Sequence, residues 1–225
     1  GTTFGSLREN SSNFRIKSEV SDKDMLFMGN DGGAEITALT LDMSAAGAAT
    51  LNNGLTLTDG NLVVANNHGI DFAAQTATSA TDAQTTNELL SHYEEGNWTP
   101  VMFSGSSTTQ PAAYAIQEGR YVRVGSILHY QGRLKINGLG SVSGNPRIGG
   151  LPFTVINDGA YPATTIGWAN GLNITAGQTI AGTPGPNTTA IELRIWNSAA
   201  GVSDMTAAEF SDDGDIIFSG TFEVV

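Results

Sequence analysis

Few residues in this chain have the chemistry needed for catalysis, and they are widely separated. The three histidines, His68, His92 and His129, fall in different segments, and no Ser-His-Asp arrangement can be assembled around any of them. Cysteine is absent, which excludes thiol nucleophiles, thiolate metal sites and disulfides. Glycoside hydrolysis needs a pair of carboxylates, which different chains of an oligomer could still assemble. We predict no catalytic residues and expect a protein that is not an enzyme.

Two further patterns have the side chains of a metal site. The stretch "SDDGD" places Asp212, Asp213 and Asp215 close together, and their oxygens suit a hard cation. His68 lies in "NNHGI" and would form a three-imidazole site if three chains met on a common axis. Both patterns more often belong to solvent-exposed turns. We therefore predict neither a metal ion nor another cofactor.

Aromatic and amide side chains in the second half form a better candidate site. Sugar rings offer apolar C–H faces and hydroxyl groups, so their sites pair an aromatic ring with amide or hydroxyl partners. Segment 161–177 contains this mixture, and Trp196 is out of phase with the apolar positions 191, 193 and 195. The predicted receptor-binding residues are Tyr161, Trp168, Asn170, Asn173 and Trp196. Alternatively, these aromatic residues cap the edge of a sandwich, and Trp98 is expected to be a packing anchor.

Residues 156–188 are expected to form a loop at the tip of the protein. This segment has one acidic residue, Asp158, and no basic residue. It therefore lacks the cations that would bind a strongly anionic polymer, and a neutral or weakly charged sugar suits it better.

The composition is that of an ordered β protein with many tight turns. The 225 residues include 28 glycines, and only 14% are charged against 40% hydrophobic. The net charge is −12 and no basic stripe is present, so we expect no nucleic-acid partner. No apolar run approaches the roughly 20 residues of a membrane helix, and no signal-like segment opens the chain. Because the first residue is Gly1, we expect a processed fragment.

The first part of the chain contains apolar segments too short to fold alone. In "GLTLTDGNLVVANNHGIDF" (54–72), each apolar group of two or three residues is interrupted by Asp, Asn or His. Strands this short cannot bury a hydrophobic face by themselves, whereas three chains wound around one axis would supply partners. The expected shared core consists of Leu55, Leu57, Leu62, Val64, Ile70 and Phe72. The alternative is a monomeric sandwich with a glycine-rich edge.

The pattern changes between residues 76 and 98. A polar linker leads into a predicted helix of two to three turns, which Thr81 or Asp82 caps and Gly96 ends. From residue 97 onwards the pattern is all β: strands are expected within 121–136, with a hairpin at Gly125-Ser126, and over 189–196. A strand pair is expected within 215–225. The sequence thus predicts an all-β homotrimeric fibre: an intertwined shaft of short β-strands (1–75), a neck with a linker and short helix (76–96), and a C-terminal β-sandwich or jelly-roll head (97–225).

Three blocks carry a resemblance to a known family. "YEEGNWTP" (93–100) resembles the "YEEGTWTP" signature that opens the C-terminal domain of many tail fibre and tailspike-like proteins of tailed bacteriophages, with Asn97 in place of the usual Thr. "EGRYVRVGSILHYQGRLKI" (118–136) and "GLPFTV" (150–155) are similar to the next two blocks of that domain. The segments "SDKDMLFMGNDGG" and "LDMSAAGAATLNNGLTL" are similar to shaft repeats of marine-phage fibres. Together the blocks cover most of the chain in the expected order.

The resemblance implies a receptor-binding protein located in the virion, at the phage tail and outside the cell. Its implied partners are two further copies of the chain, an upstream phage tail protein, and a host cell-surface glycan or outer-membrane receptor. We expect attachment to the host without catalysis. The alternative is a structural or capsid-decorating fibre with no receptor of its own, and a glycan depolymerase is a third possibility.

Overall fold

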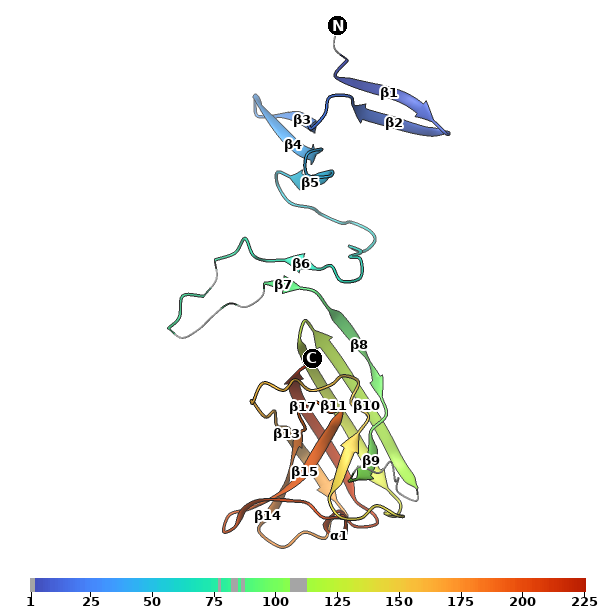
Figure 1. The fold of residues 1–225 in the computed structure, drawn as a ribbon, viewed down its shortest axis with the longest axis vertical. Helices are drawn as coiled ribbons and strands as arrows, with labels where there is room; N and C mark the ends of the chain where they lie inside the picture. Colours follow the sequence, from blue (N-terminus) through green and yellow to red (C-terminus); the bar gives the residue numbers. More distant parts are fainter. Residues whose placement is uncertain (1–2, 77, 82–84, 86–87, 106–112) are drawn as a thin grey trace. The chain divides into compact units, whose positions relative to one another are not determined.

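The computed structural model of the chain describes residues 3–76, 78–81, 85, 88–105 and 113–225. Nearly all of its regular structure is β, as the sequence predicts (Figure 1). The chain divides into two compact units, Gly1–Val63 and Val64–Val225, each of which is described by itself. None of the helices in the described ranges has the length and apolar character needed to cross a membrane.

Two small antiparallel sheets make up the first unit. A hairpin joins β1 (Gly5–Asn10) to β2 (Asn13–Ser18), and both residues of its turn, Ser11 and Ser12, have positive φ. The second sheet consists of β3 (Met25–Asp31), β4 (Ala34–Asp42) and β5 (Ala48–Leu51). No residue between 3 and 63 is buried. Neither sheet therefore encloses a core within a single chain.

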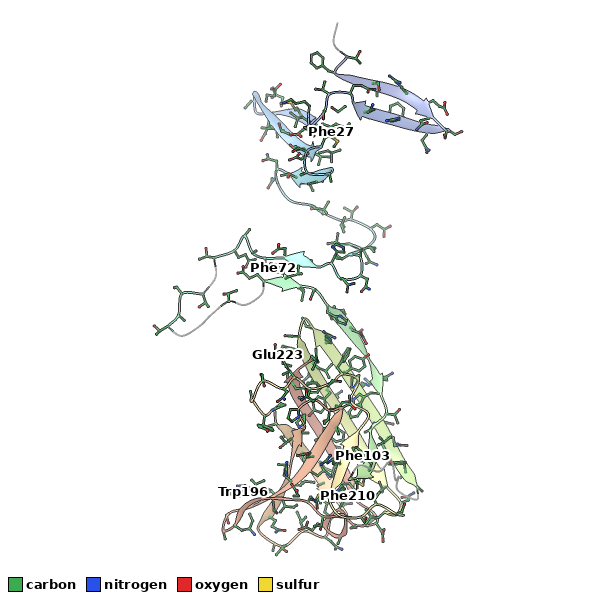
Figure 2. All side chains as sticks on the ribbon, in the orientation of Figure 1. Phe27, Phe72, Phe103, Trp196, Phe210 and Glu223 are labelled. Atoms are coloured by element: carbon green, nitrogen blue, oxygen red, sulfur yellow. The ribbon has the colours of Figure 1, made fainter. Side chains whose placement is uncertain are left out.

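Large apolar side chains in residues 3–72 remain exposed. Phe27 of β3 is 45% exposed and Phe72 is 40% exposed, whereas Phe210, in the second unit, is fully buried (Figure 2). The residues predicted to share a core between chains are likewise 40% to 62% exposed in the single chain: Leu55, Leu57, Leu62, Val64, Ile70 and Phe72. Of the short strands expected over 54–72, only β6 (Ile70–Asp71) is present, paired with β7 (Leu89–Leu90). Residues 52–69 contain no strand within one chain.

The helix predicted at the neck is wrong over the residues that the structure describes there. Leu89 and Leu90 lie in β7, and the strand β8 (Tyr93–Trp98) follows directly. Asp82, one of the two predicted caps, lies outside the described residues. Tertiary pairing explains the difference, because β8 forms an antiparallel ladder with β10 (Tyr114–Val124) that a helix could not provide.

Residues 93–225 of the second unit contain one curled antiparallel sheet (Figure 1). From here on we call this range the head, since the sheet begins at Tyr93, before the predicted start at residue 97. Its described strands follow the path β8-β10-β11-β17-β13-β14-β15-β12-β9, with β16 beside β15. The bounds not yet given are β9 (Val101–Ser104), β11 (Ile127–Ile136), β12 (Pro146–Gly149), β13 (Thr164–Asn170), β14 (Gln178–Pro184), β15 (Ala190–Asn197), β16 (Gly201–Asp204), α1 (Ala207–Phe210) and β17 (Asp215–Glu223).

The curl of the sheet follows from its two terminal strands. β8 and β9 stand at opposite ends of the path, yet only Thr99 and Pro100 separate them in the chain. The two ends of the sheet must therefore lie close together, and the sheet encloses one core. About half of the buried apolar residues come from β11, β15 and β17: Leu128, Tyr130, Leu134, Ile136, Ala190, Ile191, Leu193, Ile195, Ile216, Phe218 and Phe222.

Several details of the predicted head strands are confirmed. The hairpin turn at Gly125-Ser126 joins β10 to β11, with Gly125 at a φ of 60°. In β15, the side chains of Ile191, Leu193 and Ile195 are buried and Trp196 is 46% exposed, as the alternation predicts.

Beside the turn at Gly125-Ser126, Val124 and Ile127 are each 45% exposed on the outer face, and Leu128 and Tyr130 face the core. Two other details are wrong. Residues 215–225 contain one continuous strand, β17, rather than a strand pair, since Ser219 and Gly220 pair with β11 on one side and β13 on the other. The loop expected over 156–188 contains β13 and β14, which complete the sheet.

Candidate functional site

The five predicted receptor-binding residues do not form one cluster. Tyr161 precedes β13, is 71% exposed and lines a hollow of about 190 Å³ together with Val155 and Glu223. Asn170 is at the other end of β13, a seven-residue strand that spans roughly 20 Å. Tyr161 therefore cannot share one sugar-sized site with Asn170.

Asn173 and Trp196 lie towards the same end of the head as Asn170. The backbone N–H of Asn173 donates a hydrogen bond to the carbonyl oxygen of Glu209 in α1 (2.8 Å), which places its loop beside this short helix. Trp196 is opposite Thr179 of β14 and Val202 of β16, and its side chain lies near the end of the head (Figure 2).

A β-bulge determines the direction in which Trp168 points. The register of β13 against β17 shifts between Ile166 and Trp168, so Ile166 is opposite the buried Phe218 while Trp168 is opposite the exposed Ile217. In a regular strand, residues two apart face the same side, and Trp168 would follow Ile166 towards the core. The extra residue, Gly167, turns Trp168 to the opposite face of the sheet. Trp168 is therefore 43% exposed on the outer face.

An arginine lies over the ring of Trp168. The guanidinium carbon of Arg133, on β11, is 5.5 Å from the ring centroid, within the range of a cation–π contact. Arg133 also forms two hydrogen bonds with Asp215, from Nε to Oδ1 (3.0 Å) and from the terminal nitrogen to Oδ2 (2.8 Å). Asp215 is only 2% exposed. These hydrogen bonds, with smaller electrostatic contributions from Asp215 and then Glu118, raise the pKa of Arg133 above its usual value, and burial partly opposes the shift.

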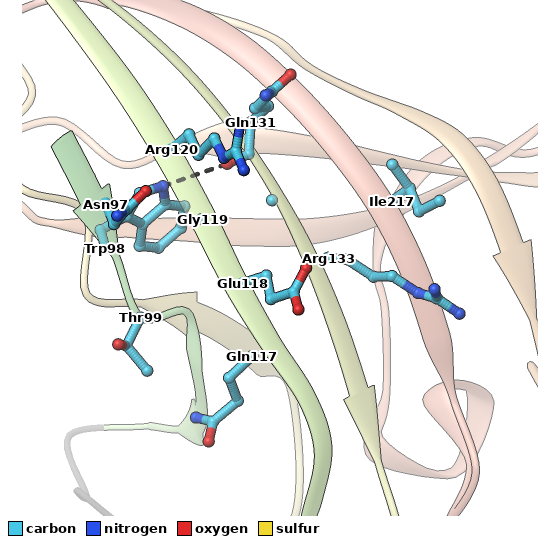
Figure 3. Close-up of a pocket in the computed structure, with 11 residues that line it drawn as sticks. Asn97, Trp98, Thr99, Gln117, Glu118, Gly119, Arg120, Gln131, Arg133 and Ile217 are labelled. Carbon is cyan, nitrogen blue, oxygen red and sulfur yellow. Dashed lines mark hydrogen bonds between the residues drawn. The ribbon is translucent and has the colours of Figure 1, made fainter. Parts of the chain in front are cut away.

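A groove of about 560 Å³ begins beside Arg133 on the same face (Figure 3). We call it the outer groove. It crosses the outer side of β8, β10 and β11 and reaches β17 at Ile217. Antiparallel register places Asn97, Arg120 and Gln131 directly next to one another on three neighbouring strands. Two residues further along these strands, Glu118 is opposite Arg133, and Arg133 is opposite Ile217 on its other side.

Trp98 anchors the strands beneath the outer groove. Its Nε1 donates a hydrogen bond to the carbonyl oxygen of Gln131 (3.3 Å; Figure 3), and it is 7% exposed. Its indole occupies the position where a Cβ on Gly119 would lie, 2.4 Å from Nε1. Trp98 also makes edge contacts with the rings of Tyr130 and Phe218. The prediction that Trp98 is a packing anchor is confirmed.

The charges around the outer groove have both signs. Arg120 and Glu118 are exposed, and Arg120 makes no ion pair with any carboxylate in the described ranges. Arg133 is neutralised by Asp215. A surface with balanced charges and amide groups forms hydrogen bonds with uncharged polar ligands, and it does not attract a polyanion such as a nucleic acid.

The carboxylates considered for metal binding make hydrogen bonds to other residues of the head. No group of three or more His, Asp or Glu side chains that could hold a metal ion occurs among the described residues. Asp212 accepts a hydrogen bond from the backbone N–H of Leu139 (2.8 Å), and Asp213 accepts one from the hydroxyl of Ser211 (2.6 Å). These carboxylates therefore hydrogen-bond to residues in and around the turn after α1.

The start of β8 contains a second hydrogen-bonded cluster. The Tyr121 hydroxyl donates to the carboxylate of Glu94, and His92 Nε2 is 3.2 Å from the same side chain. The bond from Tyr121, and to a lesser degree the one from His92, lowers the pKa of Glu94. The ring of Phe153 packs against His92 and Tyr121 and lies under the guanidinium of Arg123. This cluster fixes the first residues of the "YEEGNWTP" segment onto the head.

Sequence reasoning identified Trp168 but missed the polar residues of the outer groove. A signal was present, because "EGR" and "HYQGR" place polar side chains at alternate positions: Glu118 and Arg120 in one strand, and His129, Gln131 and Arg133 in the next. The sequence pattern could not predict the strand register that aligns these two strands with Asn97 and with Trp168.

Comparisons with known proteins support the fold. No protein-family model matches the chain, and no curated protein sequence matches it. Among solved structures, the crystal structure of the Dettilon tailspike protein is similar to this chain, with a TM-score of 0.50 and 17% sequence identity. The similarity covers 59% of this chain and 24% of the tailspike chain, so it concerns about a quarter of that protein. At this identity the likeness shows a shared fold, and this chain has a β fold found in a tailspike.

Proposed function

We propose that the chain is the receptor-binding part of a tailed-phage fibre or spike, and that its head attaches to a host cell-surface glycan without catalysis. The observation that carries this proposal is the half-exposed Trp168, held under Arg133 at the edge of a polar groove. An exposed indole beside amide and charged hydrogen-bonding groups suits the apolar face and the hydroxyls of a sugar. The fold shared with a tailspike and the "YEEGNWTP" segment support a location in the phage tail.

The proposed functional form is an elongated homotrimer, attached through its N-terminal side to another tail protein. The exposed apolar side chains of residues 3–72 support this form, because a soluble monomer rarely exposes so many large apolar residues in one region. Two further copies of the chain would provide strand partners and cover these side chains. One chain has a mass of 23.4 kDa, and light scattering should give three times this value. The mass of a single chain would contradict the trimer.

The attachment function is tested by replacing Trp168. Stacking and neutral hydrogen bonds give weak binding, about 4 kcal/mol per site or a millimolar dissociation constant. Three sites per trimer and many fibres per particle would then raise the avidity. Trp168→Ala should abolish binding of the full chain to a glycan array and to host cells, with a melting temperature close to that of the wild type.

Trp196→Ala is the matched control, because Trp196 is similarly exposed but lies on β15, whereas Trp168 contacts Arg133, which lines the outer groove. Loss of binding in the control and not in Trp168→Ala would move the site to β15. A chain that binds no glycan and no cell would favour the alternative of a structural fibre.

A further inference from the structure

A second hollow continues the outer groove along the sheet. It has a volume of about 570 Å³ and is lined by Glu95, Val122 and His129, among others. Asn97, Arg120 and Gln131 line both hollows, so the two are contiguous. We call the two hollows together the long groove.

The long groove is longer than a single sugar. His129 is four residues from Arg133 on β11, which corresponds to about 14 Å in an antiparallel strand. Trp168 extends this surface beyond Arg133, because the guanidinium carbon of Arg133 is 5.5 Å from its ring centroid. Each hollow alone has the volume typical of a pocket for one small ligand. The continuous surface therefore suits a chain of several units.

The long groove offers both hydrogen-bond donors and hydrogen-bond acceptors. The amides of Asn97 and Gln131 can both donate and accept, Arg120 can only donate, and the ionised carboxylate of Glu118 can only accept. The side chains of Asn97, Arg120 and Gln131 are exposed. A neutral polyol offers hydroxyls that act in both senses, so it can satisfy such a row, whereas a polyanion would be repelled by Glu95 and Glu118.

We propose that the long groove binds a neutral oligosaccharide of several units. One unit stacks on Trp168 and Arg133, the next units contact Glu118 and then the neighbouring Asn97, Arg120 and Gln131, and the chain continues towards His129. This inference rests on the proposed function and adds the class and the length of the ligand. Arg120 and Gln131 are then the residues that make binding depend on length.

The test is a titration series with the full chain. A glycan array first identifies a neutral glycan that the chain binds, and fragments of that glycan, from monosaccharide to hexasaccharide, are then titrated by calorimetry. The variants are Arg120→Ala, Gln131→Ala and the double variant, with Arg147→Ala as the control. Arg147 lies on β12 and lines neither hollow.

Affinity should rise with fragment length and then level off. Each single variant should weaken binding of the long fragments about fivefold to tenfold, as expected for the loss of one or two hydrogen bonds. The variants should not change binding of the shortest fragment, which Trp168 holds. Affinity should change little between low and physiological ionic strength, because the ligand carries no charge.

The possible failures can be told apart. One outcome overturns this inference and leaves the proposed function standing. In it, binding needs Trp168 but depends neither on fragment length nor on Arg120 and Gln131. Absence of binding to any glycan overturns both. A changed oligomer mass in the double variant, measured by light scattering, would place a second copy of the chain in the long groove and also overturn the inference.

Discussion

The pair formed by Arg133 and Asp215 should show a strong asymmetry when either partner is replaced. Asp215 has a side chain only 3% exposed, whereas the side chain of Arg133 is 39% exposed. Arg133→Met leaves a buried carboxylate without its partner, and removal of one member of a buried ion pair costs about 3–5 kcal/mol. Asp215→Asn leaves a guanidinium that water can reach and keeps one acceptor for it. Its cost should be about 1–2 kcal/mol.

Thermal unfolding of the full chain at a fixed protomer concentration measures both costs. For a chain of this size, Arg133→Met should lower the melting temperature by roughly 6 to 20 °C. The double variant should be more stable than the sum of the single effects predicts, because the two residues interact directly. Equal losses for the two single variants, or additive losses in the double variant, would refute the argument that burial of Asp215 makes this pair asymmetric.

Three other positions give predictions about stability and assembly. Burial raises the pKa of Tyr130 to about 12 although its hydrogen bond with Thr164 opposes this, so its contribution to stability is complete below pH 10 and is lost as the pH rises towards 12. Tyr130→Phe should lower the free energy of unfolding by about 1 kcal/mol at pH 7, as measured by urea unfolding. It should also reduce the loss of stability between pH 10 and 12. If the free energy of unfolding fell with pH as steeply as in the wild type, this prediction would be contradicted. Gly119→Ala should displace the Trp98 indole, because the new Cβ would lie 2.4 Å from Nε1. The variant should therefore show a changed tryptophan fluorescence and a lower melting temperature. Unchanged fluorescence would mean that strand β10 moves and the indole stays in place. Leu62→Asp should prevent or weaken formation of the proposed trimer, because three like charges would be buried near its axis at a cost of several kcal/mol per site. Normal assembly in light scattering would place Leu62 on the outer surface of that trimer.

The sequence predicted the class of the fold because alternation is a local signal. From Ile191 to Ile195 of β15, apolar and polar residues alternate, and both the strand and its buried face are confirmed. In the hairpin of β10 and β11, the apolar residues Val122, Val124 and Ile127 lie on the outer face. The inner face of β10 has Gly119 where the indole of Trp98 must fit. Packing against a distant residue determined this face, and alternation alone could not reveal it.

The neck helix failed as a prediction for a related reason. Leu89, Leu90 and Tyr93 share a spacing that suits a helix face, but Leu89 and Leu90 pair with β6 and Tyr93 pairs with β10. The candidate site was predicted only in part. Trp168 was recognised from its residue type, whereas the bulge at Gly167 and the strand register that place Arg133 beside it depend on long-range pairing.

The closure of the sheet by β8 and β9 has a mechanical consequence. Tension that reaches the head through residue 92 pulls on β8, which is held to β10 by six antiparallel residue pairs. When the pull runs along the strand, these pairs are loaded in parallel and must yield together, which resists rupture far better than opening the pairs one after another. The bend at Thr99 and Pro100 then passes any remaining load to β9 and β12 at the other end of the sheet. If the chain attaches a particle to a surface as proposed, flow acting on that particle would strain this part of the sheet first.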